Sequence, residues 1–449
     1  MTFERSKTLE MSKSYSAKWI IAADGNLYED STMIVDEGKV QQIVKTADFD
    51  QNTVKHNKDF GNSIITPGFI NLHNHLQYTE VGKIKSKGLK YSLKKIFTNF
   101  KKHYFVAGIK KDAFIYKLAD LLSEYFCLGR EEKIHSFKKG LELSLLSGTT
   151  CVAQLSKESK YFDVLNEIPI KTYLFFELFS DSPDSSKEEF RLIQKKIDKL
   201  LKQKSENTFV GVAPHSVCSV HKRLFKTLVK YCKKNNILMT VRLAESKDEM
   251  DWLKFGFSDV DILNSFTGHK KFEPNIQGVS PVVYLDELGA INKRLLATYG
   301  NYLTKEDLEI LKEHSSSFVY CPRVSDNLHN KKLDLETVLK YFPKKFGFGT
   351  NNLAFNRDLS LLNEVKYVNK GELTALEAVQ YLTKYPAKIL RLDNIIGTLE
   401  EGKDADFNVF KLNDDEDYNA ILNKERPDYV YIKGHKMVSK GELVKKYAG

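Results

Sequence analysis

Short apolar runs alternate with longer amphipathic segments through the middle of the chain. Beyond a first apolar run that ends near residue 75, seven runs are expected to form strands: 149–154, 171–178, 209–214, 237–243, 294–299, 317–321 and 346–350. The segments between them have helical periodicity. Thr304-Lys305-Glu306-Asp307 and Thr374-Ala375-Leu376-Glu377 have the form of N-terminal capping boxes. Strands that alternate with helices in this way predict an α/β fold, a closed (β/α)8 TIM barrel.

The two ends of the chain have a different pattern, of short strands joined by close turns. Near the start these are residues 19–23, 31–35 and 39–44, and near the end they are 406–410 and 429–438. Neither group has enough strands to close a core, so we expect them to pair in one small β-sandwich. The predicted domains are 1–62 for the N-terminal half of the sandwich, 63–394 for the barrel, and 395–449 for the C-terminal half.

Composition narrows the class of protein. The 449 residues are 42% hydrophobic, enough for a large core, but the chain contains no apolar run long enough to span a bilayer, so no membrane partner is expected. The five cysteines form no Cys-x-x-Cys pair, which favours reduced thiols and a cytoplasmic location. The sequence carries no signal for an oligomeric state.

The net charge of +10 comes largely from lysines scattered over amphipathic helices, a pattern that favours solvated faces over nucleic-acid binding. One denser stretch, residues 83–111, mixes lysines with aromatic residues. It leaves a basic nucleic-acid-binding scaffold as one alternative function.

Candidate chemistry begins at the end of the first apolar run, where His73-Asn74-His75 follows Pro67-Gly68. Side chains two apart on a strand point the same way, so His73 and His75 should converge on one point. Barrels of this type place their chemistry at the C-terminal ends of the strands. The pair is therefore half of a candidate metal site, although a lone His-x-His also occurs among ordinary core or solvated histidines.

Several further motifs accompany the run 67–75 in order along the chain. They are Gly148-Thr149-Thr150, Val212-Ala213-Pro214-His215-Ser216, Leu243-Ala244-Glu245, Tyr320-Cys321-Pro322-Arg323 and Gly402-Lys403-Asp404-Ala405-Asp406-Phe407. Together they resemble the amidohydrolase superfamily, in its cytosine-deaminase-like branch of deaminases and chlorohydrolases. The run Leu361-Leu362-Asn363-Glu364 and the stretch that ends at Trp252 are most similar to aminofutalosine deaminase. The resemblance implies a barrel enzyme that uses zinc or iron to hydrolyse C–N bonds of aminopurine-like small molecules.

The resemblance also implies which positions hold the metal, and here the chain departs from the family. His73 and His75 match, but the three remaining ligand positions carry Arg242, Tyr299 and Asn351. An arginine has no acceptor atom and stays protonated, and its repulsion of a divalent ion about 4 Å away costs roughly 8 kcal/mol at an effective dielectric of 20. A tyrosine with a pKa of about 10 is a poor ligand, and an asparagine lacks the family's carboxylate. We therefore expect either no cofactor or a weakly bound divalent metal.

This pattern leads to a hypothesis about Arg242. Its guanidinium is expected to fill the vacated metal cavity and to hydrogen-bond toward Tyr299, Asn351 or a carboxylate, because a buried arginine needs partners. The alternative is that Arg242 turns outward.

The resemblance implies two further site residues. Glu245 stands at the family's proton-shuttling position, and His215 matches a histidine that usually touches substrate. Each has a structural alternative: Glu245 as a partner of Arg242 or a helix cap, and His215 as a packing residue.

Three interpretations remain open from sequence. The first is a barrel that has lost metal-dependent hydrolysis, a pseudoenzyme, and binds a small molecule or a partner. The second is an active but atypical deaminase with a residue such as His269 or His329 recruited to a metal. The third is the basic scaffold.

Overall fold

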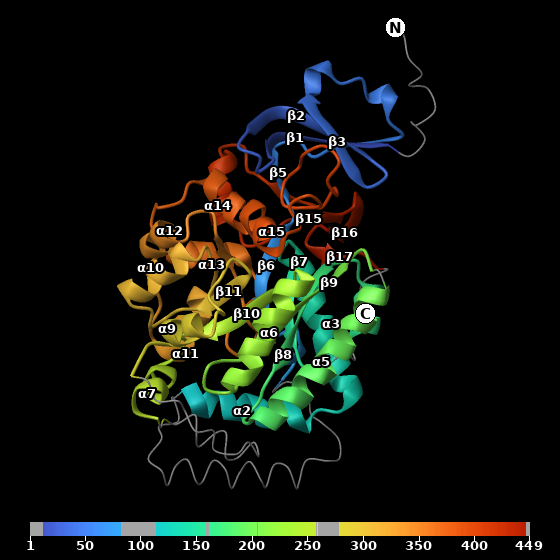
Figure 1. Ribbon diagram of the computed structural model, residues 1–449. Coiled ribbons are helices and arrows are strands. Elements are labelled where there is room, and N and C mark those ends of the chain that lie inside the picture. Colours follow the sequence, from blue (N-terminus) through green and yellow to red (C-terminus); the bar gives the residue numbers. More distant parts are fainter. Residues whose placement is uncertain are drawn as a thin grey trace.

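The architecture comes from a computed structural model, which describes residues 12–81, 114–158, 161–203, 205–256, 258 and 278–445. A parallel eight-stranded sheet runs through the middle of the molecule (Figure 1). Its strands, in order, are β6 (Phe69–Asn74), β7 (Thr149–Ser156), β8 (Lys171–Leu178), β9 (Thr208–Pro214), β10 (Leu238–Leu243), β11 (Leu295–Tyr299), β12 (Ser317–Tyr320) and β13 (Phe346–Phe348). All eight lie where the apolar runs predicted strands.

The two edge strands of this sheet, β13 and β6, meet and close it into a barrel. The backbone N–H of Asn351 donates to the His73 carbonyl at 2.9 Å, and the His75 N–H donates to the Asn351 carbonyl at 2.8 Å. Every residue of β7 and β8 is buried, as expected for strands with side chains inside the barrel on one face and helices on the other. The predicted (β/α)8 barrel is confirmed.

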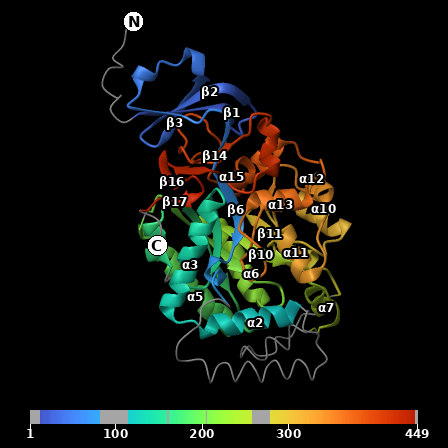
Figure 2. The same cartoon turned by 180° about the vertical axis from the view of Figure 1, so that it is seen from behind.

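Helices surround the barrel strands in both views (Figures 1 and 2). They are α2 (Phe114–Cys127), α3 (Arg130–Leu146), α4 (Phe162–Glu167), α5 (Pro183–Gln203), α6 (Lys222–Asn235), α7 (Lys247–Phe255), α9 (Pro281–Glu287), α10 (Lys305–Glu313), α11 (Pro322–His329), α12 (Leu335–Tyr341), α13 (Leu361–Val368), α14 (Ala375–Leu382) and α15 (Lys384–Leu390). The capping boxes predicted at Thr304 and Thr374 are both formed. Within the described ranges, every helix is too short or too polar to cross a bilayer.

The two ends of the chain combine in a second, nine-stranded sheet above the barrel (Figure 1). Its strands are β1 (Lys13–Ile21), β2 (Leu27–Asp36), β3 (Lys39–Lys45), β4 (His56–Asp59), β5 (Ser63–Pro67), β14 (Phe407–Lys411), β15 (Tyr429–Ile432), β16 (His435–Ser439) and β17 (Glu442–Leu443). The N-terminal and C-terminal strands join where β5 pairs antiparallel with β14. The two ends of the chain thus pair as expected, in one continuous sheet.

A buried ion cluster connects this sheet to the barrel. Lys171, at the N-terminal end of β8, lies 2.8 Å from carboxylate oxygens of both Asp404 and Asp406. Burial opposes the lysine charge, but the two aspartates raise the pKa of Lys171 above its usual value. The motif Gly402–Phe407 therefore supports the fold from the end of the barrel opposite the candidate site.

Two sequence-based candidates fall outside this description. The basic stretch 83–111 and His269 lie beyond the described residues. The nucleic-acid interpretation of that stretch, and the recruitment of His269, therefore stay predictions.

Candidate functional site

The C-terminal strand ends bring the sequence-predicted residues together. His73 and His75, at the end of β6, are both buried, and their ring centroids lie 5.1 Å apart. Arg242 from β10 and Tyr299 from β11 approach them from across the barrel. The two histidine rings therefore lie side by side at one strand end.

The guanidinium of Arg242 points toward these histidines and not outward. Its Nη2 donates to Nε2 of His75 at 2.8 Å, and its Nη1 donates to Nε2 of His215 at 2.7 Å. Nη2 also lies 3.5 Å from a carboxylate oxygen of Glu177. The outward alternative is therefore wrong, and of the three partners expected, only the carboxylate is found.

These hydrogen bonds fix the protonation of both rings. Arginine can only donate, so Nε2 of His75 and Nε2 of His215 must accept, and each ring carries its proton on Nδ1. For His215, that Nδ1–H donates to the hydroxyl of Ser219 at 2.8 Å. Burial lowers the pKa of His75 well below its usual value, and Arg242, His73 and His215 lower it further. His75 is therefore a neutral imidazole, and Arg242 uses the Nε2 lone pairs of both His75 and His215.

Tyr299 and Asn351 form a second group beside the first. The Nδ2 of Asn351 donates to the Tyr299 hydroxyl, which lies 3.3 Å from Nε2 of His73. Because that hydroxyl already accepts from Asn351, its own proton is directed to His73. Burial raises the pKa of Tyr299 well above its usual value, so its side chain is a neutral phenol. The expectation that these two residues bond to Arg242 is corrected: they bond to each other and to His73.

The backbone at these strand ends is unusual. Tyr299 has φ of 75° and Asn351 has φ of 60°, in the left-handed region that a bulky side chain rarely adopts. Such conformations cost about 1–3 kcal/mol each and occur where the surrounding structure forces them. At Gly349, an added Cβ would lie 2.6 Å from the His73 Cβ, so only glycine allows the strands to approach this closely.

Glu177 is a site residue that the sequence reasoning missed. Its Oε2 lies 3.9 Å from Nδ1 of His75, so one carboxylate faces both the imidazole and Arg242. Burial raises the pKa of Glu177, while Arg242 and then Lys157 oppose that rise. The available signal was a charged residue directly after the apolar stretch 173–176, near the C-terminal end of the predicted strand 171–178.

The space left within the barrel near Arg242 is small. A cavity of about 10 Å³, bordered by His73, Glu177, Thr240 and Arg242, has room for about one water molecule. The barrel interior beside Arg242 is therefore filled by side chains.

Glu245 follows β10 and does not pair directly with Arg242. Its Oε1 lies 3.5 Å from Nε2 of His329, a residue at the end of α11 whose side chain is 3% exposed. Its charge nevertheless contributes to the raised pKa of Arg242, where burial acts in the opposite sense. His329 is thus placed near the site, next to a carboxylate.

Glu249, in the first turn of α7, fixes the backbone at Glu245. Its Oε2 accepts the Glu245 N–H at 2.8 Å, and the residue is 3% exposed. Burial raises the pKa of the Glu249 carboxyl to about 8, in part offset by the backbone donors. The carboxyl therefore titrates near neutral pH.

This shift predicts a pH-dependent stability. The pKa of Glu249 is higher in the folded state than in the unfolded state. Its contribution to the unfolding free energy is therefore full below about pH 4.5 and is lost as pH rises through about 8. Replacing it by Glu249→Gln removes this dependence. Between about pH 4.5 and 8, the unfolding free energy of wild type should therefore fall relative to that of the variant, by up to about 1.4 kcal/mol per pH unit. Above about pH 8 the difference should level off. Urea titrations from pH 5 to 9 measure this, with the exposed Glu313→Gln as control; a constant difference would contradict it.

Arg323 connects two of the family-like motifs. Its Nε donates to Glu364 at 2.9 Å, and its Nη2 donates to Asp358 at 2.8 Å. The buried pair of Arg323 and Glu364 supports the loop that follows β13. Cys321, which precedes it, is fully buried, and burial raises the pKa of its thiol, consistent with packing.

The donor set does not fit the divalent metal that the resemblance implies. A metal at the matching positions would need the Nε2 lone pairs of His73 and His75. Arg242, a fixed positive charge, engages that of His75, and the Tyr299 hydroxyl lies 3.3 Å from that of His73. Across the described ranges, no group of three or more His, Cys, Asp or Glu side chains is placed to hold a metal ion.

Comparison with known proteins places this geometry in a family. The sequence profile of the amidohydrolase family matches residues 64–437. The chain belongs to the amidohydrolase family. The membership expected from the motifs is therefore confirmed.

This amidohydrolase-family chain is similar to several deaminases. It is 24% identical over 334 residues to the 5-methylthioadenosine/S-adenosylhomocysteine deaminase of Clostridium tetani, an alignment that covers 70% of this chain and 72% of the relative. An adenosine deaminase from Xanthomonas campestris with bound zinc superposes with a TM-score of 0.75 and 17% identity, covering 98% of this chain and 95% of that one. The aminofutalosine deaminase of Helicobacter pylori in complex with methylthio-coformycin superposes with a TM-score of 0.74 and 20% identity, covering 95% of this chain and 100% of that one. At these identities, the two structures establish the shared fold.

Proposed function

We propose that this member of the amidohydrolase family binds an adenosine-like small molecule at the barrel mouth and does not carry out metal-dependent deamination. The observation that supports this most directly is the position of Arg242. Its guanidinium donates to Nε2 of His75 at 2.8 Å and so uses a lone pair that a hydrolytic metal would need, and it also donates to His215 at 2.7 Å. A positive charge already occupies the place where the family's cation is expected.

The choice of ligand class rests on the relatives. Similar proteins are deaminases of 5-methylthioadenosine, S-adenosylhomocysteine and adenosine, and one similar structure holds methylthio-coformycin. Glu245 is the group proposed to bind such a ligand, because its carboxylate can accept hydrogen bonds from an exocyclic amine. The outward lone pair of His215 is used by Arg242, so we do not assign that residue a proton-transfer role.

The proposal predicts two results for purified wild-type protein. Elemental analysis after exposure to zinc should show substoichiometric metal, and incubation with 5-methylthioadenosine, S-adenosylhomocysteine or adenosine should release no ammonia. The same nucleosides should nevertheless stabilise the fold, by about 2.7 kcal/mol at a hundredfold excess over Kd. Calorimetric titration and thermal unfolding measure the binding.

Two variants make the binding test specific. Glu245→Gln should weaken nucleoside binding, whereas Glu313→Gln, a change of the same kind on the exposed end of α10, should not. Stoichiometric metal together with turnover would show an active, atypical deaminase. Absence of both metal and nucleoside binding would refute the ligand class.

A further inference from the structure

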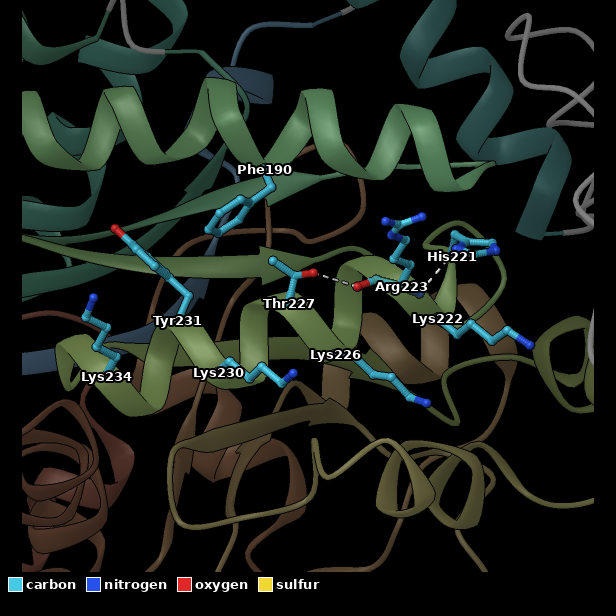
Figure 3. Close-up of a pocket in the computed structure, with 9 residues that line it drawn as sticks. All are labelled: Phe190, His221, Lys222, Arg223, Lys226, Thr227, Lys230, Tyr231 and Lys234. Carbon is cyan, nitrogen blue, oxygen red and sulfur yellow. Dashed lines mark hydrogen bonds between the residues drawn. The ribbon is translucent and has the colours of Figure 1, made fainter.

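A groove on the outer surface of the barrel lies between α5 and α6, apart from the strand-end site. It has a volume of about 610 Å³. Its lining is mostly basic and aromatic: Phe190, His221, Lys222, Arg223, Lys226, Thr227, Lys230, Tyr231 and Lys234 (Figure 3). Except for Phe190, which comes from α5, these residues belong to α6 or immediately precede it.

Among the described residues, the basic side chains of the groove have no carboxylate partner. In the ranges that the structure describes, no carboxylate forms an ion pair with Lys222, Arg223, Lys226, Lys230 or Lys234. Burial lowers the pKa of His221, and the charges of Lys222 and Arg223 lower it further, against an opposing effect of Asp181. The groove therefore carries a concentrated positive potential, with Asp198 near Tyr231 as an acidic neighbour.

The charges are arranged in a line. Lys222, Lys226 and Lys230 follow one another at four-residue intervals, so each is roughly 6 Å further along the helix axis than the last. Figure 3 shows these three side chains extending along one side of α6. Such a row matches a linear ligand with regularly repeated negative charge better than a single compact anion.

Aromatic and hydrogen-bonding groups lie on the other side of the same helix. Thr227 and Tyr231 face α5, and Phe190 projects from α5 toward them (Figure 3). The Phe190 and Tyr231 rings pack edge to face with centroids 5.3 Å apart. Both side chains are partly exposed, so each can offer ring surface to a ligand base.

We propose that the α5–α6 groove binds single-stranded nucleic acid, with the lysine row along the phosphates and Phe190 and Tyr231 beside the bases. A basic groove that follows the backbone, together with aromatic rings for stacking, is the general solution for binding single strands. A lipid surface is flat on this scale and fits a flat or convex face best, whereas this face is hollowed. The inference differs from the interpretation of residues 83–111 and does not depend on the proposed nucleoside binding.

The test uses the full-length protein and a fluorescently labelled oligouridine, with binding followed by anisotropy across a series of KCl concentrations. The triple variant Lys222→Glu/Lys226→Glu/Lys230→Glu should lower the affinity about tenfold or more. Each lost phosphate contact changes the slope of log Kd against log salt by about 0.7 for single strands. This slope should therefore be shallower by about 2 for the triple variant. Variant Phe190→Ala should weaken binding without changing this slope.

A matched control carries the same charge change at three exposed lysines elsewhere: Lys305→Glu/Lys345→Glu/Lys436→Glu. It should bind nearly as wild type does. Equal losses in both triple variants would indicate a general charge effect and overturn the proposal. It would also be overturned by undetectable oligouridine binding, or by tighter binding to polyglutamate or to phosphatidylserine vesicles than to oligouridine. Circular dichroism melts of all variants confirm that the fold is kept.

Discussion

The combined variant Arg242→His/Tyr299→His/Asn351→Asp should gain stoichiometric zinc and release ammonia from 5-methylthioadenosine, neither of which is expected of wild type. The three changes remove the guanidinium that donates to His75 and His215 and supply the ligand types that the family resemblance places at these strand ends. Binding to the folded state alone should stabilise the variant by about 4 kcal/mol at a thousandfold excess of zinc over Kd. Elemental analysis, zinc-dependent thermal unfolding and an ammonia assay measure the three effects.

A control variant at the same positions separates ligand supply from simple removal of the arginine. Arg242→Gln/Tyr299→Phe/Asn351→Ala also abolishes the fixed charge, but it provides no imidazole and no carboxylate. It should take up no stoichiometric zinc. A restored variant that folds normally but still binds no metal would show that changes beyond these three closed the site. Metal uptake without ammonia release would place the remaining block in substrate binding.

The barrel was predictable from sequence because its information is local. Each buried strand is a short apolar run, and the segments between them have helical periodicity and explicit caps such as Thr304. The convergence of His73 and His75 followed from the two-residue period of a strand. The inward direction of Arg242 followed from the need of a buried charge for partners.

The identity of those partners was not predictable in the same way. Which side chains meet across a closed barrel depends on the stagger between strands, and no local pattern encodes it. Glu177 on β8 reaches Arg242 on β10 at 3.5 Å, and Asn351 reaches Tyr299 after the barrel closes beside His73. The basic row on α6 was also missed, because three lysines on one helix predict only a solvated face. The groove beside them depends on the position of the neighbouring helix α5, which the sequence alone does not give.

Arg242→Met should destabilise the fold by about 3–5 kcal/mol, the usual cost of removing one partner from a buried charged cluster. The loss has two sources: Glu177 is left buried without its cation, and the Nε2 atoms of His75 and His215 lose their donor. Arg191→Met, an exposed position on α5, should change stability by less than about 0.5 kcal/mol. Urea unfolding at pH 7 measures both.

The pH dependence and a double variant test the cause. Arg242 opposes the rise that burial imposes on the pKa of Glu177, so without the arginine that pKa should rise further. A carboxyl whose pKa is higher in the folded state than its unfolded value of about 4.5 stabilises the fold at low pH, and this stabilisation is lost as pH rises. The loss of unfolding free energy in Arg242→Met should therefore grow from pH 4.5 upward. In the double variant Arg242→Met/Glu177→Gln, the deficit should be smaller than the sum of the single changes and should lose this pH dependence. Additive, pH-independent losses would mean that Arg242 stabilises the barrel by packing alone, and that its charge is not what holds the two histidines in their present state.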